Sequence, residues 1–326
     1  MGSLRILMPL LLVFASLVAT LAQDPPQLKV YVQLTSLDVS VNDAAGRPVT
    51  NLKRSDFTIL EDGQPREILN FDSAEAPYNI LLLFDRSSST EDQWQYLATA
   101  LSRFLALLPP QHRVAIAAFD DKTEMLFDWK GVREFSRQAI AIPSRYGGTD
   151  VYRALEWSVQ ELRETKGRAG VIAFTDGVDN RLSKQLVSFD KNRTPSIAPM
   201  EQDRDFEKML RVIQGGRNPI YFIAVNTDLN PDPREPHNSF NIKQRTAARL
   251  RMERVAERSN GVVHLPKRMD DIEALYATIA RELGTAYSLG FTPGHPAADG
   301  SFHRIEVRVA DKSMKVVQSR EGYYAR

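Results

Sequence analysis

The sequence contains no cysteine and only five histidines among its 326 residues. The absence of cysteine excludes disulfide bonds, thiol chemistry and a lipid-modified N-terminal cysteine. The histidines, at positions 112, 237, 264, 295 and 303, are scattered without the spacing of metal ligands. No G-x-S-x-G, H-E-x-x-H or P-loop motif occurs. These absences together predict a protein that is not an enzyme.

An excess of charge of one sign is also lacking. The chain has 42 Lys and Arg against 41 Asp and Glu, for a formal net charge of +1. Arg5 is the only charged residue in 1–22, so the rest of the chain is formally neutral. We therefore expect neither nucleic acid nor an anionic membrane surface as a partner. With 43% hydrophobic residues, the chain is long enough for one large domain or two smaller ones.

A long apolar run occurs only at the N-terminus, where residues 1–22 read MGSLRILMPLLLVFASLVATLA. One arginine precedes the run and small residues end it, which predicts a cleaved secretory signal peptide. The run is close to spanning length, so an uncleaved membrane anchor is the alternative. Pro9 and the small residues favour cleavage. We expect a secreted or periplasmic protein with no membrane span once the signal is removed.

The stretch LLLFDRSSST, residues 81–90, is central to the chain. Its apolar run predicts a buried parallel strand, and the helical spacing of apolar residues in 91–108 predicts a helix after it. Asp85, Ser87 and Ser89 then lie on the loop at the carboxyl end of the strand, where open α/β sheets bind ligands. One carboxylate and two hydroxyls at alternate positions suit a hard cation such as Mg²⁺. Taken alone, the pattern is equally explained by a hydroxyl that caps the helix.

Two later stretches repeat this arrangement. The glycine-rich RYGGTD, residues 145–150, places Thr149 before a second helix, and VIAFTDG, residues 171–177, is a second apolar strand that ends in Asp176. At this point the chain resembles the von Willebrand factor type A domain family, whose metal-ion-dependent adhesion site is D-x-S-x-S with a distant Thr and a distant Asp. The resemblance implies that the metal ligands are Asp85, Ser87, Ser89, Thr149 and Asp176. It also implies a divalent cation, Mg²⁺ or else Ca²⁺ or Mn²⁺, that accepts a carboxylate from a protein partner.

The sequence departs from the family's usual strand ending at Arg86, and at Thr90, where an apolar Met is often seen. Arg86 would lie near the cation, where it either lowers metal affinity or binds the acid of the partner directly. Two alternatives to a binding or adhesion module follow. One is an envelope scaffold or assembly protein whose metal site is vestigial or structural. The other is a metal-dependent hydrolase or phosphatase, which the serine at position 87 disfavours because aspartyl-phosphate phosphatases need an acid there.

Strands alternate with helices over 78–284, which predicts a doubly wound, mostly parallel α/β domain of von Willebrand A or Rossmann-like type. The flanking segments 28–76 and 286–326 are predicted to be all-β, and each is too short to bury a core alone. We expect the two segments to pair into one small sandwich-like domain that the α/β domain interrupts. Both also resemble the leader and tail of bacterial secreted proteins of acidobacterial type that are related to the von Willebrand factor type A domain.

Several acids and polar stretches are open to more than one interpretation. The stretches 181–200 and 226–241 predict exposed loops, and 181–200 either selects the partner or is an insertion without fixed structure. Asp120 and Asp121 predict a solvated turn rather than outer ligands of the metal. Asp43 and Asp62 predict turn aspartates bonded to their own backbone rather than a calcium loop.

Overall fold

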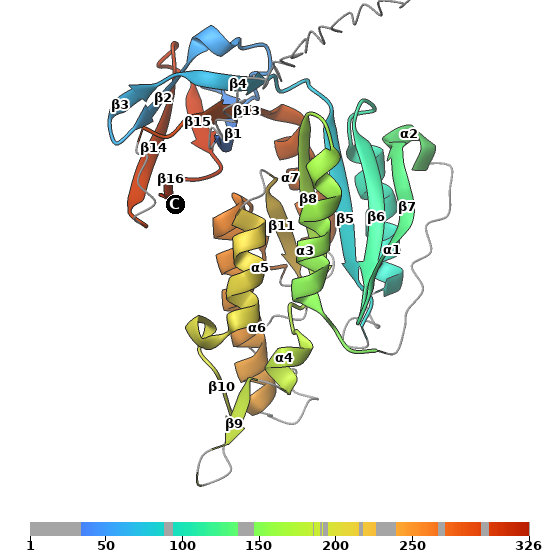
Figure 1. The fold of residues 1–326 in the computed structure, drawn as a ribbon. Coiled ribbons are helices and arrows are strands. Elements are labelled where there is room, and N and C mark those ends of the chain that lie inside the picture. Colours follow the sequence, from blue (N-terminus) through green and yellow to red (C-terminus); the bar gives the residue numbers. More distant parts are fainter. Residues whose placement is uncertain are drawn as a thin grey trace, which may run out of the picture. The chain divides into compact units, whose positions relative to one another are not determined.

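Everything described in the computed structural model belongs to one compact unit within Gln33–Arg326 (Figure 1). The predicted signal peptide, 1–22, lies outside the described residues, and so does Ser89. The structure describes residues 34–87, 94–135, 147–184, 186–189, 191, 195–214, 218–225, 239–266, 271–294 and 300–325.

A six-stranded, mostly parallel sheet forms the centre of the larger domain. Every residue of its central strand is buried, as expected for an apolar run covered on both faces. The outermost strand, β7, is antiparallel to its neighbour, as is common at the edge of such sheets. In spatial order the strands are β12 (Val263–His264), β11 (Ile220–Ala224), β8 (Arg168–Thr175), β5 (Tyr78–Asp85), β6 (Arg113–Phe119) and β7 (Thr123–Gly131).

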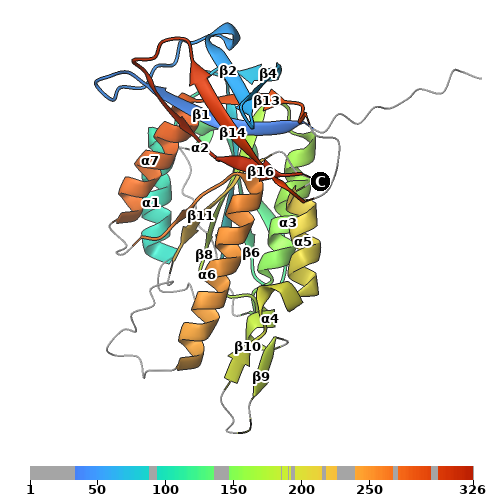
Figure 2. The ribbon, with the colours of Figure 1, turned by 90° about the vertical axis from the view of Figure 1, so that its left-hand side faces the viewer.

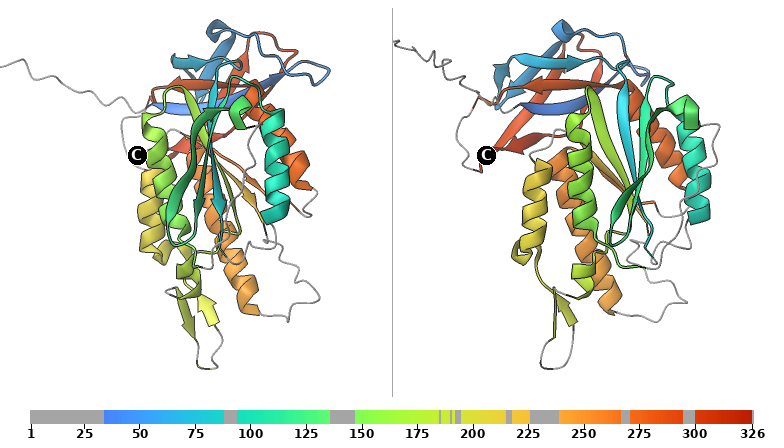
Figure 3. Two further views of the ribbon diagram at one scale, coloured as in Figure 1. Left: turned by 90° about the vertical axis from the view of Figure 1, so that its right-hand side faces the viewer. Right: turned by 45° about the vertical axis from the view of Figure 1, so that its right-hand side comes forward.

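Helices cover both faces of this sheet (Figure 3). The even-numbered residues of β5, such as Leu82 and Phe84, pack in a core with α1 (Trp94–Leu107), α2 (Val132–Phe135) and α7 (Asp271–Thr285). Leu81 and Leu83 point to the other face, where α3 (Val151–Glu161), α5 (Arg204–Gln214) and α6 (Ser239–Ser259) complete a second core. The predicted doubly wound α/β architecture is therefore confirmed.

The two terminal segments pair, as predicted, into a small sandwich of two four-stranded sheets. Strand β1 pairs with β13, and β2 pairs with β14, so each sheet joins strands from both ends of the chain. Leu37, Ile59, Leu289 and Val307 lie in the core between them. One sheet has the order β15 (Lys315–Gln318), β1 (Thr35–Asn42), β13 (Ala286–Phe291), β4 (Ile68–Asp72) and the other β16 (Gly322–Tyr324), β14 (Phe302–Val309), β2 (Phe57–Glu61), β3 (Gln64–Arg66).

The α/β domain joins the sandwich with little intervening chain. Helix α7 ends at Thr285 and β13 begins at Ala286, so the last helix continues directly into a central strand of the sandwich. On the other side, residues 73–77 connect β4 to β5. None of the described helices combines the length and the hydrophobicity that crossing a bilayer requires.

The prediction of an unbroken loop over 181–200 is wrong. This stretch contains α4 (Asn180–Ser183) and an antiparallel hairpin of β9 (Val187–Phe189) and β10 (Pro195–Ile197). Figure 2 shows the hairpin extending beyond α4. Strands of three residues are too short for alternation to reveal them. The predicted loop 226–241 is also too long, because α6 begins at Ser239, and 226–238 lies outside the described residues.

His112 provides a test of how the α/β domain responds to acid. Its side chain is fully buried, and its Nδ1 accepts the backbone N–H of Tyr78 at 3.3 Å. Burial, aided by the charge of Arg168, lowers the pKa of His112 from 6.5 to about 4. The unfolded chain then binds the proton more tightly than the folded protein does. The contribution of His112 to the free energy of unfolding is therefore complete above pH 6.5, and the stability falls by about 3 kcal/mol as the pH is lowered to 4.

We expect the His112→Gln variant to lose this part of the acid sensitivity, because glutamine does not titrate. Urea unfolding of both proteins at about pH 4.5 and about pH 7.5 measures the difference. The same loss of stability on acidification in parent and variant would show that His112 contributes nothing to it.

Candidate cation site

Asp85 is the last residue of β5, and its carboxylate is almost completely buried, with 1% of the residue exposed. One oxygen accepts the backbone N–H of Ser87 at 3.0 Å, and the other accepts the hydroxyl of Thr175 at 2.6 Å. Thr175 ends the neighbouring strand β8. These bonds hold the Asp85 carboxylate at the carboxyl edge of the sheet, between two parallel strands.

The structure brings four of the five predicted ligands to this edge, all of them buried. Ser87 follows Asp85 on its loop, and Asp176 follows Thr175 on the next one. Thr149 lies on a third loop. Its backbone carbonyl oxygen accepts the N–H of Asn180 at 2.9 Å, which joins this loop to the one after β8. The exposed fractions of Ser87, Thr149 and Asp176 are 2%, 6% and 4%. Ser89, the fifth, lies outside the described residues.

The electrostatics of this edge fit a divalent cation. Burial, reinforced by the negative charge of Asp176, raises the pKa of Asp85 to about 7. Two buried carboxylates that repel each other are stabilised when a cation neutralises them. Within the described ranges, no group of three or more His, Cys, Asp or Glu side chains could hold a metal, so a cation here depends on hydroxyl oxygens as well. Two carboxylates with hydroxyls and water are a donor set that Mg²⁺ accepts.

Arg86, the departure from the family pattern, points into the protein. Its side chain is fully buried, with Nε donating to Asp120 at 2.9 Å and Nη1 donating to Glu124 at 2.6 Å. Its Nη2 has no hydrogen-bond partner among the described residues. Two carboxylates thus compensate the charge of Arg86, and its burial keeps the guanidinium away from any external acid.

The prediction of a solvated turn is right for Asp121, which is exposed, and wrong for Asp120. Asp120 is only 7% exposed, and its backbone carbonyl accepts the N–H of Asp150 at 2.9 Å. Asp121 accepts the N–H of Gly148 at 3.1 Å and the side-chain amide of Asn180 at 3.0 Å. Together with the Arg86 ion pair, these bonds tie this turn to all three loops of the candidate site. Sequence reasoning missed this role because the partners are 27 to 59 positions away from the turn.

A second polar network lies behind the Asp176 loop. Asp150 caps α3, accepting the N–H of Arg153 at 3.1 Å. Arg181 donates to both Asp150 and Asp179 at 3.0 Å. Burial raises the pKa of Asp179, although the charge of Arg181 opposes that shift. Arg181 therefore links the start of α3 to the loop after β8 and stiffens the edge that carries the candidate ligands.

Aspartates of the sandwich also differ from one another. Asp43 accepts the N–H groups of Ala45 and Arg47, both at 2.9 Å, as predicted for a turn residue. Asp62 instead bonds across to β14, accepting the N–H of Arg304 at 2.8 Å and lying 2.7 Å from Nδ1 of His303. The prediction that Asp62 bonds its own turn is wrong, because the hairpin places it beside the neighbouring strand.

Residues 80–178 match the profile of the family described as von Willebrand factor type A domain. The match spans Asp85, Ser87, Thr149 and Asp176, so the predicted family is confirmed for this stretch. The further resemblance to secreted proteins of acidobacterial type stays a prediction. The sequence matches none of the curated proteins at a significant level.

Several solved structures resemble the fold at low sequence identity. A von Willebrand factor type A protein from Catenulispora acidiphila is 10% identical over 91% of this chain and 74% of that one, with a TM-score of 0.46. The vWF domain of the type V pili tip protein Mfa5 from Porphyromonas gingivalis is 10% identical over 64% and 95%, with a TM-score of 0.42. The pilus adhesin SpaC from Lactobacillus rhamnosus GG is 13% identical over 76% and 34%, at 0.46. Similarity at this level carries no information on what the chain binds.

Proposed function

We propose, from the von Willebrand factor type A sequence at residues 80–178, that the chain is a secreted, non-enzymatic binding or adhesion module. It uses a divalent cation, Mg²⁺ or else Ca²⁺ or Mn²⁺, to bind an acidic group of a protein partner. The residues that hold the cation are Asp85, Ser87, Ser89, Thr149 and Asp176. The observation that carries the proposal is the pair of buried, mutually repelling carboxylates at the carboxyl ends of adjacent parallel strands.

Each residue of the site has a distinct part in this proposal. Asp85 and Asp176 supply the negative charge, and the hydroxyls of Ser87, Ser89 and Thr149 supply neutral oxygens. The two carboxylates balance the charge of a bound dication, and the neutral hydroxyls and water leave a coordination position that a carboxylate of the partner can take. Thr175 orients Asp85 through its 2.6 Å hydrogen bond and adds no charge to the site. The cation, when bound, supplies the electrophilic centre that the partner's acid contacts.

The state of Arg86 favours a working site over a vestigial one. A free arginine beside the two aspartates would neutralise them and remove the need for a metal. Arg86 is instead fully buried and paired with Asp120 and Glu124, so its charge is already matched. One feature favours the scaffold alternative. The sandwich domain has two sheets, whose outer surfaces could take part in assembly.

The first test is a Mn²⁺ titration followed by electron paramagnetic resonance on the chain from residue 23 onward. We expect saturable binding in the parent and a loss of about a hundredfold or more in Asp85→Ala, since a buried ligand carboxylate is removed. Circular dichroism of the variant checks that the fold is retained. Equal Mn²⁺ affinity in the two proteins would exclude Asp85 as a ligand and leave the scaffold alternative.

A further inference from the structure

A cavity of about 680 Å³ lies at the opposite edge of the parallel sheet from the candidate cation site, against the sandwich. Its lining includes Tyr78 and Arg168, which begin β5 and β8. It also includes residues of β1, β4 and β13. The volume is within the usual range for sites that bind small molecules. None of the predicted metal ligands lines it.

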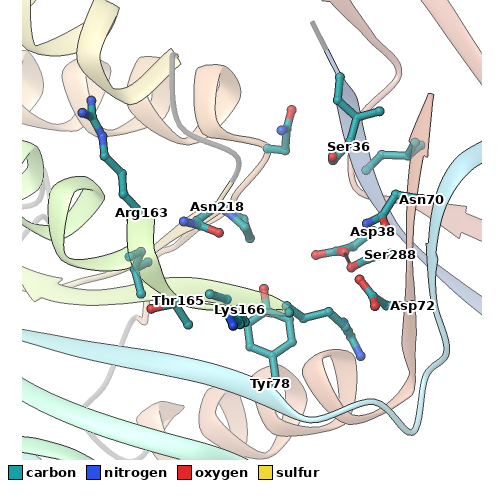
Figure 4. A pocket seen from close by; sticks show the side chains of 18 of the residues that line it. Ser36, Asp38, Asn70, Asp72, Tyr78, Arg163, Thr165, Lys166, Asn218 and Ser288 are labelled. Carbon is teal, nitrogen blue, oxygen red and sulfur yellow. Dashed lines mark hydrogen bonds between the residues drawn. The ribbon is translucent and has the colours of Figure 1, made fainter. Parts of the chain in front are cut away.

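The sandwich side of this cavity carries a row of polar side chains that the strand register creates. Asp38 on β1 is opposite Ser288 on β13, and Ser288 is opposite Asp72 on β4. The neighbouring positions Leu37 and Leu289 face the sandwich core, so this row faces outward, toward the α/β domain. Figure 4 shows Asp38, Ser288 and Asp72 beside one another on one side of the cavity.

The two carboxylates of this row differ in their partners. Asp38 accepts the hydroxyl of Ser288, while no hydrogen bond or ion pair reaches the Asp72 carboxylate from any described residue. Burial raises the pKa of Asp38 and the charge of Asp72 adds to that shift, whereas the charges of Arg168 and Arg320 oppose it. The row therefore presents negative charge and acceptor oxygens that a positively charged group can satisfy.

The α/β side of the cavity carries the opposite charge. Arg163 and Lys166 lie across from the acidic row (Figure 4), and within the described part of the chain neither side chain forms an ion pair. Arg168 is 4% exposed and lines the cavity, and its Nε lacks any hydrogen-bond partner among the described residues. A bare cation is disfavoured beside these three positive charges. An anion alone leaves the acidic row unmatched.

We propose that this cavity binds a short peptide with free ends, its α-ammonium group against Asp38, Ser288 and Asp72 and its carboxylate against Lys166 and Arg163. A zwitterion satisfies both walls at once, which neither a metal ion nor a simple anion does. The orphaned Nε of Arg168 is a further donor for a peptide carbonyl or the carboxylate. The site is independent of the proposed cation site.

Isothermal titration calorimetry with tri-alanine tests the proposal on the chain from residue 23 onward, with a chelator present so that the cation site plays no part. The comparison ligands are N-acetyl-tri-alanine and tri-alanine amide, each of which lacks one charged end. We expect tri-alanine to bind, and blocking either end to weaken binding about tenfold or more.

Variants assign each end to its wall. We expect Asp72→Asn and Lys166→Ala each to weaken tri-alanine about tenfold. The acetylated peptide is expected to be insensitive to Asp72→Asn, and the amide to Lys166→Ala. The exposed residues Lys312 and Glu321 do not line the cavity, so Lys312→Ala and Glu321→Gln are matched controls that leave affinity unchanged.

Two results would overturn the proposal. The first is the absence of binding heat with tri-alanine. If the effects of Asp72→Asn and Lys166→Ala on the free energy of unfolding are then also non-additive, the two walls of the cavity interact with each other and not with a peptide. The second is equal affinity for blocked and free peptides, which would show that the charged ends are not recognised.

Discussion

Asp176→Asn is expected to lower Mn²⁺ affinity by about a hundredfold or more, while the apo protein becomes more stable by on the order of 1 kcal/mol. The carboxylate is buried and repels Asp85, so replacing it by an amide removes both the cation's ligand charge and an unfavourable interaction. A substitution that stabilises the empty protein while it weakens binding would show that Asp176 serves the ligand and not the fold, as stability–function trade-offs predict.

Asp179→Asn is the matched control for this prediction. Asp179 stands three residues further along the same loop, is fully buried, and holds Arg181 at 3.0 Å. Its loss is expected to lower the free energy of unfolding by about 2 kcal/mol and to leave Mn²⁺ affinity within a fewfold of the parent. Urea unfolding without divalent cations and Mn²⁺ titrations on both variants separate the two roles. Equal effects of the two substitutions on affinity would contradict the assignment of Asp176 as a ligand.

The elements predicted well from the sequence are those with a long, regular pattern of apolar residues. The sequence reveals strand β5 because its apolar residues run without interruption, and α3 because Leu155 and Val159 recur at helical spacing after a capping aspartate. The pairing of the two terminal segments into a sandwich is predictable because neither segment is long enough to bury a core alone. Such signals are local, or depend only on the size of a segment.

The missed elements are short or depend on distant partners. Three residues are too few for an alternation of apolar and polar side chains to be recognised in the sequence. The strands of this length are β3, β9, β10 and β16. Strand β12 has only two residues, Val263–His264, and its edge position allows only brief pairing. Sequence spacing does not reveal that a loop acid is buried, since this depends on which other loops converge on it.

The candidate site shows the same division. Asp85, Ser87, Thr149 and Asp176 were found because a known pattern marks them, and the structure places all four at one edge of the sheet. The turn at Asp120 carries no such mark. Its role depends on an arginine 34 positions earlier, directly after the strand β5 that pairs with β6. The motif thus identifies the ligands and not the groups that position them.

Arg86→Ala is expected to cost about 3–5 kcal/mol of unfolding free energy, because it leaves Asp120 charged and buried without its partner. Asp120 is 7% exposed, whereas the Glu124 side chain is 41% exposed and can return to water. Adding Asp120→Asn to Arg86→Met should therefore recover most of the stability, since the double variant contains no unpaired buried charge. Urea unfolding of the parent, Arg86→Met, Asp120→Asn and the double variant closes the cycle, and Arg86→Ala is measured beside them.

The cation site provides the second readout for Arg86. The backbone of Asp120 holds Asp150, and Arg86 lies between Asp85 and Ser87 in the chain, so an unpaired Asp120 would shift two of the three loops. We expect Arg86→Ala to weaken Mn²⁺ binding and the Arg86→Met, Asp120→Asn double variant to restore it. An arginine that instead repelled the cation would give the opposite result, a tighter site in both variants. Tighter Mn²⁺ binding in these variants would support the alternative that Arg86 lowers the metal affinity of the site.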